Sequence, residues 1–338
     1  MDTSKRIFQL HGVNEAEQPV LRRKLSRVAM IAFFQRLEPA IVAMEACGAS
    51  HYWARELKRM GHEVRLMAPQ LVKPYVKRGK NDAADAEALC EAASRPTMRF
   101  VPVKTADRQA GLMLAGARER LVRQLTQLAN AIRGHAAEFG ITVAKGRSHI
   151  PELLARVKSD ATIPALARGV FAGLEADLAH IEARLAEADG ALRAWYKESP
   201  AAKRLAKVPG IGPVIASLLA MKTPDPHAFR SGRDFAAWLG LTPKDHSTAG
   251  KVRLGVITRA GDEALRSVLV VGATAVIRHA QRSQARVAPW LVELLKRKPP
   301  KLAAVALANK IARIAWKLMV SGEHYAARVG PVGLGAAA

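Results

Sequence analysis

The chain has 338 residues, 49% of them hydrophobic, and carries 53 Lys and Arg against 29 Asp and Glu, a net charge of +24. This length predicts two or three domains whose cores need neither metals nor disulfides, and its two cysteines, Cys47 and Cys90, fit no zinc or disulfide pattern. No stretch approaches the roughly 20 apolar residues of a membrane span, and no signal peptide is evident, so we expect a reduced cytoplasmic setting. The charge excess favours nucleic acid as the partner over a membrane surface, because no terminus is a basic amphipathic helix.

Residues 1–105 alternate between strand and helix patterns. The stretch "ASHYWARELKRMG" predicts a helix closed by Gly61, and another helix begins near Asn81. Short apolar runs predict strands over 6–13, 40–45 and 63–69. The alternation predicts an α/β layer structure.

Residues 106–197 have only helical periodicity. Apolar residues from Leu174 to Trp195 recur at spacings of four and three, as in a coiled coil, and a shorter seam runs from Leu114 to Ile132. Glycine and proline between the seams separate two helices. These helices pair with each other or with another subunit, and the sequence leaves both arrangements open.

Residues 198–325 are again mainly helical, so the expected fold class is α/β followed by all-α. Helical patterns cover 232–241, 261–280 and 300–320. The segment 242–260 between the first two predicts a loop or hairpin that carries four cations, Lys244, Lys251, Arg253 and Arg259. The tail 326–338 is of low complexity and is expected to be flexible.

Two aspartates, Asp82 and Asp85, stand three residues apart after the basic run "VKPYVKRGK". On a helix their side chains share a face about 5–6 Å apart, where each raises the cost of ionising the other. One interpretation is helix capping by Asn81 or Asp82, with Asp85 favouring the helix dipole. The other is a metal site, because a divalent cation between two carboxylates keeps both ionised.

Two further acids favour the metal interpretation. Glu45 ends the predicted strand 40–45, and open α/β sheets place their sites at the carboxyl ends of strands. Asp2 stands at the start of another strand-like segment. Four acids from such positions can hold two Mg²⁺ ions for phosphoryl displacement.

Two motifs in the last region point to phosphate chemistry. "VPGIGPVIA" is similar to the hairpin of a helix-hairpin-helix DNA-binding motif, in which Gly210 and Gly212 expose backbone N–H groups before a helix that starts at Pro213. The alternative is a plain turn packed in the core. In "PKDHSTAGK", Ser247 lies between lysines that would hold a phosphate, and His246 is either a base or a solvated loop residue.

Taken together and in this order, these segments resemble a DEDD transposase of the insertion-sequence one-ten family, in its eleven-eleven subgroup. The resemblance implies a RuvC-like, RNase-H-type catalytic domain over 1–105, a coiled-coil segment over 106–197 and a transposase domain over 198–325. Its acidic, Mg²⁺-binding tetrad falls on Asp2, Glu45, Asp82 and Asp85. The serine nucleophile falls on Ser247, with Thr248 as the neighbouring alternative.

The resemblance also implies partners. These are donor and target DNA, a structured bridge RNA as guide, and further copies of the chain in a dimer or tetramer in the bacterial cytoplasm. Nucleic-acid contacts are expected from Lys80, Gly210, Gly212, Lys244, Lys251, Arg253 and Arg259. Two alternatives stay open, a carboxylate-only nuclease specific for DNA structure and a catalytically decayed binding protein.

The start of the chain departs from the family pattern. Family members have several apolar residues before the first aspartate, whereas only Met1 precedes Asp2. We therefore expect the N-terminus to fray and its charged amino group to repel Mg²⁺. A version extended by several apolar residues is expected to bind the metal more tightly and to be more active.

Overall fold

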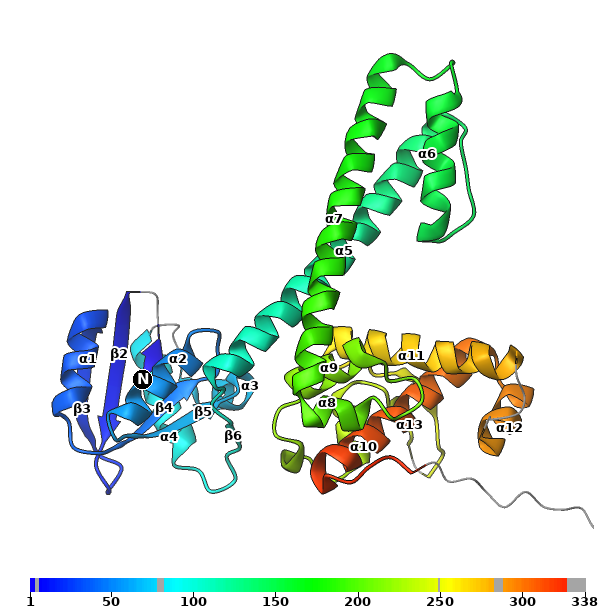
Figure 1. Cartoon of the computed structure of the whole chain (residues 1–338). Coiled ribbons are helices and arrows are strands. Elements are labelled where there is room, and N and C mark those ends of the chain that lie inside the picture. The colour runs from blue at the N-terminus through cyan, green and yellow to red at the C-terminus, as the bar shows by residue number, and fades with distance from the viewer. Residues whose placement is uncertain (4–5, 78–81, 249, 283–287, 327–338) are drawn as a thin grey trace, which may run out of the picture. The chain divides into compact units, whose positions relative to one another are not determined.

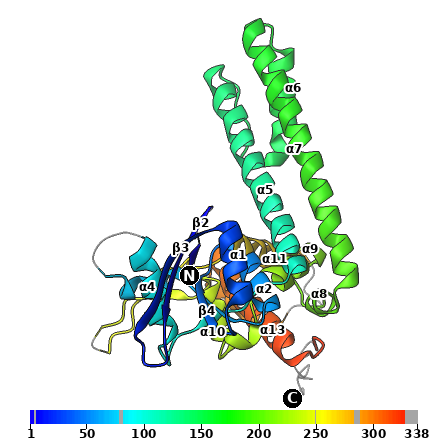
Figure 2. The same cartoon turned by 90° about the vertical axis from the view of Figure 1, so that its left-hand side faces the viewer.

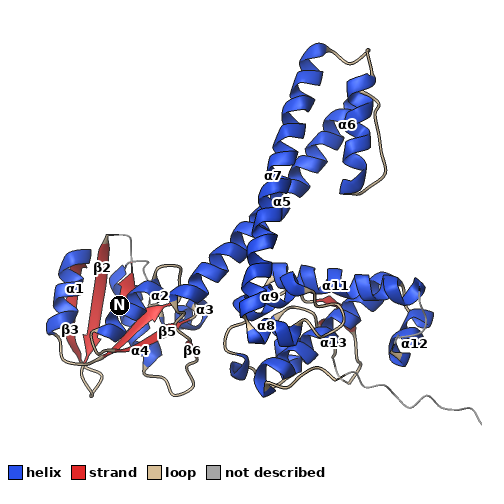
Figure 3. Cartoon of the chain, in the orientation of Figure 1, coloured by secondary structure: helices blue, strands red, loops and turns tan. Residues whose placement is uncertain are grey.

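A computed structural model describes residues 1–3, 6–77, 82–248, 250–282 and 288–326. It divides into two compact units, Met1–Ala110 and Gly111–Ala338. Lys80, Asn81 and all but the first residue of the predicted tail lie outside the described residues. The first unit contains both strands and helices, whereas the second is mainly helical (Figure 3).

The first unit contains two three-stranded sheets. In one, β1 (Asp2–Thr3), β2 (Ile7–Val13) and β3 (Pro19–Ser26) pair antiparallel in that order. In the other, β4 (Ile41–Glu45) pairs parallel with β5 (Glu63–Met67), and β5 pairs antiparallel with β6 (Phe100–Val101). The Met1 amino group donates a hydrogen bond of 2.8 Å to the Ala43 carbonyl of β4, which joins the sheets at the edge where β1 begins.

Helices bury apolar side chains of both sheets. These are α1 (Arg27–Arg36), α2 (Ser50–Arg59), α3 (Pro69–Val72), the 3₁₀ helix η1 (Lys73–Tyr75) and α4 (Asp82–Ala93). Alternation along β4 sends Met44 into a core with Trp53 of α2, while Ala43 packs in a second core with Leu89 of α4. The α/β expectation for this region is confirmed, although β3, α1 and β6 were not predicted.

The expectation that the N-terminus frays is wrong for the structure. Met1 is only 5% exposed and packs in the core that contains Trp53. Its amino group replaces a backbone N–H as a donor to β4, and burial lowers the pKa of that amine to about 6. At neutral pH the amine is therefore mostly uncharged, so the expected repulsion of a cation is weak.

The second unit begins with a long helical hairpin (Figures 1 and 2). Helix α5 (Ala106–Glu138) starts just before the division between the units, and α7 (Ala165–Glu198) runs back alongside it. Between them lie η2 (Arg147–His149) and α6 (Ile150–Ser159), a helix that was not predicted. The predicted seams pair within one chain: Leu125 and Ile132 share a core with Leu178, and Arg118 pairs with Asp189 at 2.6 Å.

The remaining helices form one core, in which α11 and α13 are the longest. In chain order they are α8 (Pro200–Leu205), α9 (Pro213–Lys222), η3 (Pro226–Ala228), α10 (Gly232–Trp238), α11 (Glu263–Arg282), α12 (Pro289–Arg297) and α13 (Pro300–Ser321). The predicted helices over 232–241, 261–280 and 300–320 are confirmed as α10, α11 and α13. The segment between α10 and α11 is a hairpin of β7 (Pro243–Asp245) and β8 (Leu254–Ile257). No helix among the described residues combines the length and apolarity that crossing a membrane requires.

Candidate functional site

The four predicted acids lie on three elements that pack against one another in the first unit. Asp2 is in β1, Glu45 ends β4, and Asp82 and Asp85 occupy the first turn of α4. Helix α4 contacts both β1 and β4, and these two strands contact each other. Segments far apart in the sequence thus bring their acids to one region.

The pKa of Glu45 indicates which of these acids lie near one another. The pKa of Glu45 is raised, first by burial and then by the negative charges of Asp2 and Asp85. Each nearby carboxylate disfavours ionisation of Glu45, as expected when like charges share a site. Asp82 is exposed at the start of α4. Asp2, Glu45 and Asp85 therefore form an acidic group, which we call the carboxylate cluster.

The donor chemistry of this cluster fits a hard divalent cation. Carboxylate oxygens are the ligands that Mg²⁺ prefers, and a cation would relieve the repulsion that, after burial, raises the pKa of Glu45. Within the described residues, no three His, Cys, Asp or Glu side chains lie close enough to enclose one ion. The cluster thus has the charge and the atoms of a cation site but not its closed ligand geometry.

Ser247 lies in the second unit, in the turn that connects β7 to β8, and is exposed to solvent. Its hydroxyl oxygen accepts a hydrogen bond of 3.0 Å from the Arg253 N–H, and its own N–H donates to Asp245 Oδ1 at 2.8 Å. The neighbouring Thr248 pairs through its backbone with Lys251, at 2.9 and 3.3 Å. The turn thus holds the Ser247 hydroxyl in a defined, solvent-accessible position.

Asp245 is a residue that the sequence did not single out. A hydrogen bond from the Ser247 side chain lowers the pKa of this carboxyl, with a second contribution from the Ser247 backbone. Asp245 therefore stays ionised beside the hydroxyl. The spacing Asp-x-Ser in a predicted hairpin would have been the signal, because residues two apart on a strand share a face. His246 points to the other strand, where its ring lies 3.2 Å from the position that a Cβ on Gly255 would take.

Four predicted phosphate contacts lie along this hairpin, Lys251 and Arg253 at its turn, Lys244 in β7 and Arg259 at its base beside Gly240. Lys244, Lys251, Arg253 and Arg259 are all exposed. In the part of the chain that the structure describes, none of the four forms an ion pair with a carboxylate. Their charge is therefore available for phosphates.

The two glycines of the predicted DNA-binding turn have different environments. Gly210 has a φ of +89°, and a Cβ there would lie 3.1 Å from the Gly272 carbonyl oxygen of α11. Gly212 caps α9 and is exposed, with no neighbouring atom within 4 Å of the Cβ position. Gly210 is therefore a packing residue, as the alternative interpretation expects, while Gly212 leaves the start of α9 accessible.

Comparison with known proteins identifies the family. A model of the "Transposase IS116/IS110/IS902 family" matches residues 202–288, and a DEDD transposase model of IS110 type matches residues 1–140. The chain is 64% identical over 326 residues to the y4pF/y4sB protein of Sinorhizobium fredii, covering 96% of this chain and 84% of that protein. It is 37% identical to the transposase for insertion sequence element IS1328 of Yersinia enterocolitica, over 96% of this chain and 97% of the relative. The chain belongs to the IS110 family of insertion-sequence transposases.

Membership makes this chain a DNA transposase. It is also 36% identical to the transposase for element IS1111A of Coxiella burnetii, over 96% of this chain and 90% of the relative. The two matched regions of the transposase contain its two candidate centres. The carboxylate cluster lies in the DEDD match and Ser247 in the other.

Proposed function

We propose that this transposase is a recombinase guided to donor and target DNA by a structured bridge RNA, and that it cuts and rejoins strands with a carboxylate-bound Mg²⁺ and the Ser247 hydroxyl. In this proposal residues 1–105 form a RuvC-like catalytic domain, 106–197 a helical coiled-coil spacer and 198–325 the transposase domain. The active assembly is a dimer or tetramer. The guide RNA and the assembly rest on the resemblance described above.

The observation that carries the catalytic part is the hydrogen bonding of Ser247. Its hydroxyl accepts from the backbone N–H of Arg253 and lies against the ionised Asp245, in a turn that carries the exposed cations Lys251 and Arg253. The cations would hold a DNA phosphate beside the hydroxyl. The hydroxyl needs a proton acceptor to become a nucleophile, and Asp245 is the adjacent one.

The covalent step is a displacement at phosphorus. The Ser247 oxygen forms a bond to phosphorus, and the bond from phosphorus to one bridging sugar oxygen breaks. The hydroxyl proton passes to Asp245, and the leaving sugar oxygen takes up a proton from solvent. The product is a phosphoserine link that a second strand can resolve.

The carboxylates have a separate role in this proposal. Asp2, Glu45, Asp82 and Asp85 would hold Mg²⁺, which supplies stabilisation of the negative charge that builds up on phosphate oxygens. Burial and the neighbouring negative charges raise the pKa of Glu45, and a bound cation would stabilise the ionised carboxylate against both effects. Asp82 at the exposed start of α4 would complete the set.

The test is a denaturing assay for covalent protein–DNA adducts, with the full chain, its element's RNA and labelled DNA. We expect an adduct that is lost in Ser247→Ala and kept in Thr248→Ala, with RNA and DNA binding unchanged in both. An adduct lost only in Thr248→Ala would move the nucleophile by one residue. Mg²⁺-dependent cleavage without any adduct would favour the carboxylate-only nuclease, and no cleavage at all would favour a decayed copy.

A further inference from the structure

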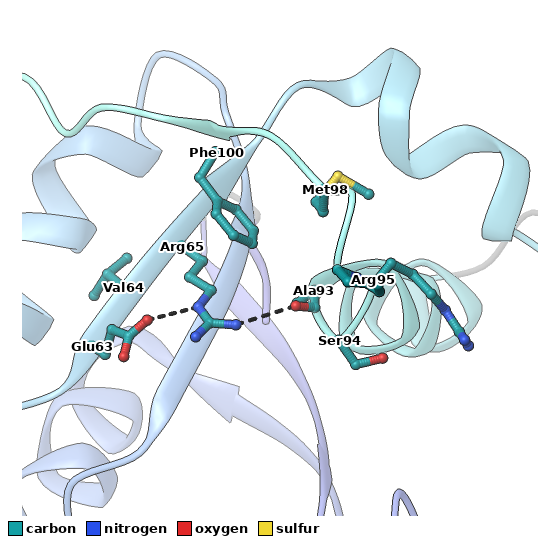
Figure 4. Close-up of a pocket in the computed structure, with 9 residues that line it drawn as sticks. Glu63, Val64, Arg65, Ala93, Ser94, Arg95, Met98 and Phe100 are labelled. Carbon is teal, nitrogen blue, oxygen red and sulfur yellow. Dashed lines mark hydrogen bonds and ion pairs between the residues drawn. The ribbon is translucent and has the colours of Figure 1, made fainter. Parts of the chain in front are cut away.

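The first unit contains a second feature with binding character, an open cavity of about 410 Å³ between β5, β6 and the carboxyl end of α4 (Figure 4). Glu63 and Arg65 of β5 lie on one side of it, and Ser94 and Arg95, which follow α4, lie on the other. The cavity is distinct from the carboxylate cluster, because none of Asp2, Glu45 and Asp85 lines it. Glu45 is in register with Met67, and Met67 is in register with Phe100, so two strand spacings, about 10 Å, separate Glu45 from Phe100.

One wall of the cavity contains an aromatic ring with a guanidinium group lying over it. Phe100 is 41% exposed, which is high for a phenylalanine. The Arg65 guanidinium lies 5.3 Å from the centre of its ring. Arg65 shares a face of the sheet with Phe100, because Phe100 is in register with Met67, two residues further along β5.

Two hydrogen bonds fix the Arg65 guanidinium in this position. Its Nε atom pairs with Glu63 at 2.7 Å, and its Nη1 atom donates to the Ala93 carbonyl at the end of α4 at 3.3 Å. The side chain is therefore ordered before any ligand arrives, so little rotamer entropy remains to be lost on binding. A preformed surface of this kind is suited to stacking.

The facing wall includes Arg95, whose side chain points away from Phe100 and Arg65 (Figure 4) and would have to turn toward a bound phosphate. Arg95 pairs with Glu91 at 3.2 Å, and both side chains are about two-fifths exposed, at 41% and 39%. Exposed pairs of this spacing contribute little stability, so the Arg95 guanidinium can exchange Glu91 for a phosphate at small cost. Ser94 beside it carries a hydroxyl that donates to the Glu91 carbonyl at 3.0 Å and retains acceptor capacity.

We infer that this cavity binds the base of an unpaired nucleotide, stacked on the exposed ring of Phe100 next to Arg65, with Arg95 turning from Glu91 to the nucleotide's phosphate. Aromatic rings and guanidinium planes are the surfaces on which proteins stack unpaired bases. A base inside a duplex has both faces covered by its neighbours, so a duplex would leave the exposed ring of Phe100 uncovered. The carboxylates of an acidic peptide would pair with the arginines but would not stack on the ring. The inference needs only that the transposase handles nucleic acid, and does not depend on Ser247 or the carboxylates.

The test uses short single-stranded oligonucleotides and the full chain. We expect Phe100→Ala to weaken binding about tenfold without changing the salt dependence, because stacking releases no counterions. Phe100→Trp should restore binding, and Arg95→Gln should flatten the log–log salt slope by about 0.7. The matched control is Phe139→Ala, which removes another phenylalanine of similar exposure, 39%, and should leave affinity within twofold.

Two further arms make the outcome specific. An oligonucleotide with abasic positions should bind the parent and Phe100→Ala equally, and a photoreactive 5-iodouracil strand should crosslink to the peptide that contains Phe100. The assay is run with DNA strands and with RNA strands. The strand type that loses more affinity in Phe100→Ala is the one that the cavity binds. An equal loss on abasic strands, unchanged affinity in Phe100→Ala, or crosslinks confined to other peptides would overturn the inference.

Discussion

Replacing Gly272 in α11 by alanine would place a methyl group against the turn that joins α8 to α9. A Cβ built on Gly272 lies 2.0 Å from the Gly210 carbonyl oxygen and 3.2 Å from a methyl carbon of Ile215. The obstructing atom is backbone, so it cannot rotate away as a side chain would. Gly210 also has a φ of +89°, which fixes the path of the turn at this point.

The size of the effect follows from the overlap. Ordinary contact begins near 3.4 Å, so α11 and the turn must separate by about 3.4 − 2.0 = 1.4 Å. Overpacking of a core costs about 1–3 kcal/mol, and a backbone displacement of this size belongs at the upper end. Alanine gains about 1 kcal/mol over glycine in a helix. The net prediction for Gly272→Ala is a loss of about 2 kcal/mol of stability.

The assay is native-state hydrogen exchange at buried amides of α9 and α11, which reports the opening free energy of this core alone. Gly190→Ala in α7 is the matched control, because no atom lies within 4 Å of its Cβ position. There the helix gain is unopposed, so α7 amides should become more protected. Unchanged protection around α9 in Gly272→Ala would refute the account, since the turn would then yield without cost and Gly210 would not be a packing residue.

Three further predictions concern charged groups. Burial and then the charges of Lys104, Arg55 and Arg108 lower the pKa of His51 to about 4. Since the usual pKa of histidine is about 6.5, the first unit should lose stability as pH falls from 6.5 to 4. His51→Gln should reduce that loss, measured by urea unfolding at pH 7 and pH 5. Asp85→Asn should lower the pKa of Glu45 in an NMR titration, because the Asp85 charge helps to raise it; an unchanged value would show that the two side chains are far apart. Asp245→Asn keeps an acceptor for the Ser247 N–H but removes the negative charge. Formation of the protein–DNA adduct should therefore slow at least tenfold, while DNA binding changes little. An unaltered rate and pH profile would show that Asp245 only stabilises the turn.

Much of the fold was predictable because it rests on local patterns. The strands ending at Glu45 and Met67 are short apolar runs, and the positive φ of +95° at Gly61 ends α2 as the sequence predicts. The elements that were missed have weaker local signals. Strand β3 contains four charged or polar residues among its eight, and its pairing with β2 decides its conformation. Helix α6 is short and lies in a segment rich in glycine and proline.

The candidate site was predictable in composition but not in geometry. The acids of β1, β4 and α4 stand out in the sequence, yet only the packing of these elements places Asp2 and Asp85 near Glu45. The pairing of Asp245 with Ser247 depends on the register of the β7–β8 hairpin, which turn chemistry alone did not specify. Long-range packing and register are the properties that a single sequence encodes least directly.

The two candidate centres have opposite charge, and this affects which steps, DNA binding or strand cleavage, require Mg²⁺. The hairpin around Ser247 carries four exposed cations that form no ion pair among the described residues, against the single carboxylate of Asp245, so it attracts phosphates in the absence of any metal. The carboxylate cluster repels phosphates, because three acids share one region; burial, and then the charges of Asp2 and Asp85, raise the pKa of Glu45. A phosphate can approach the cluster only after its negative charge has been offset. DNA binding by this transposase should therefore be independent of Mg²⁺ while strand cleavage requires it, and a chelator should separate the two activities in a single preparation.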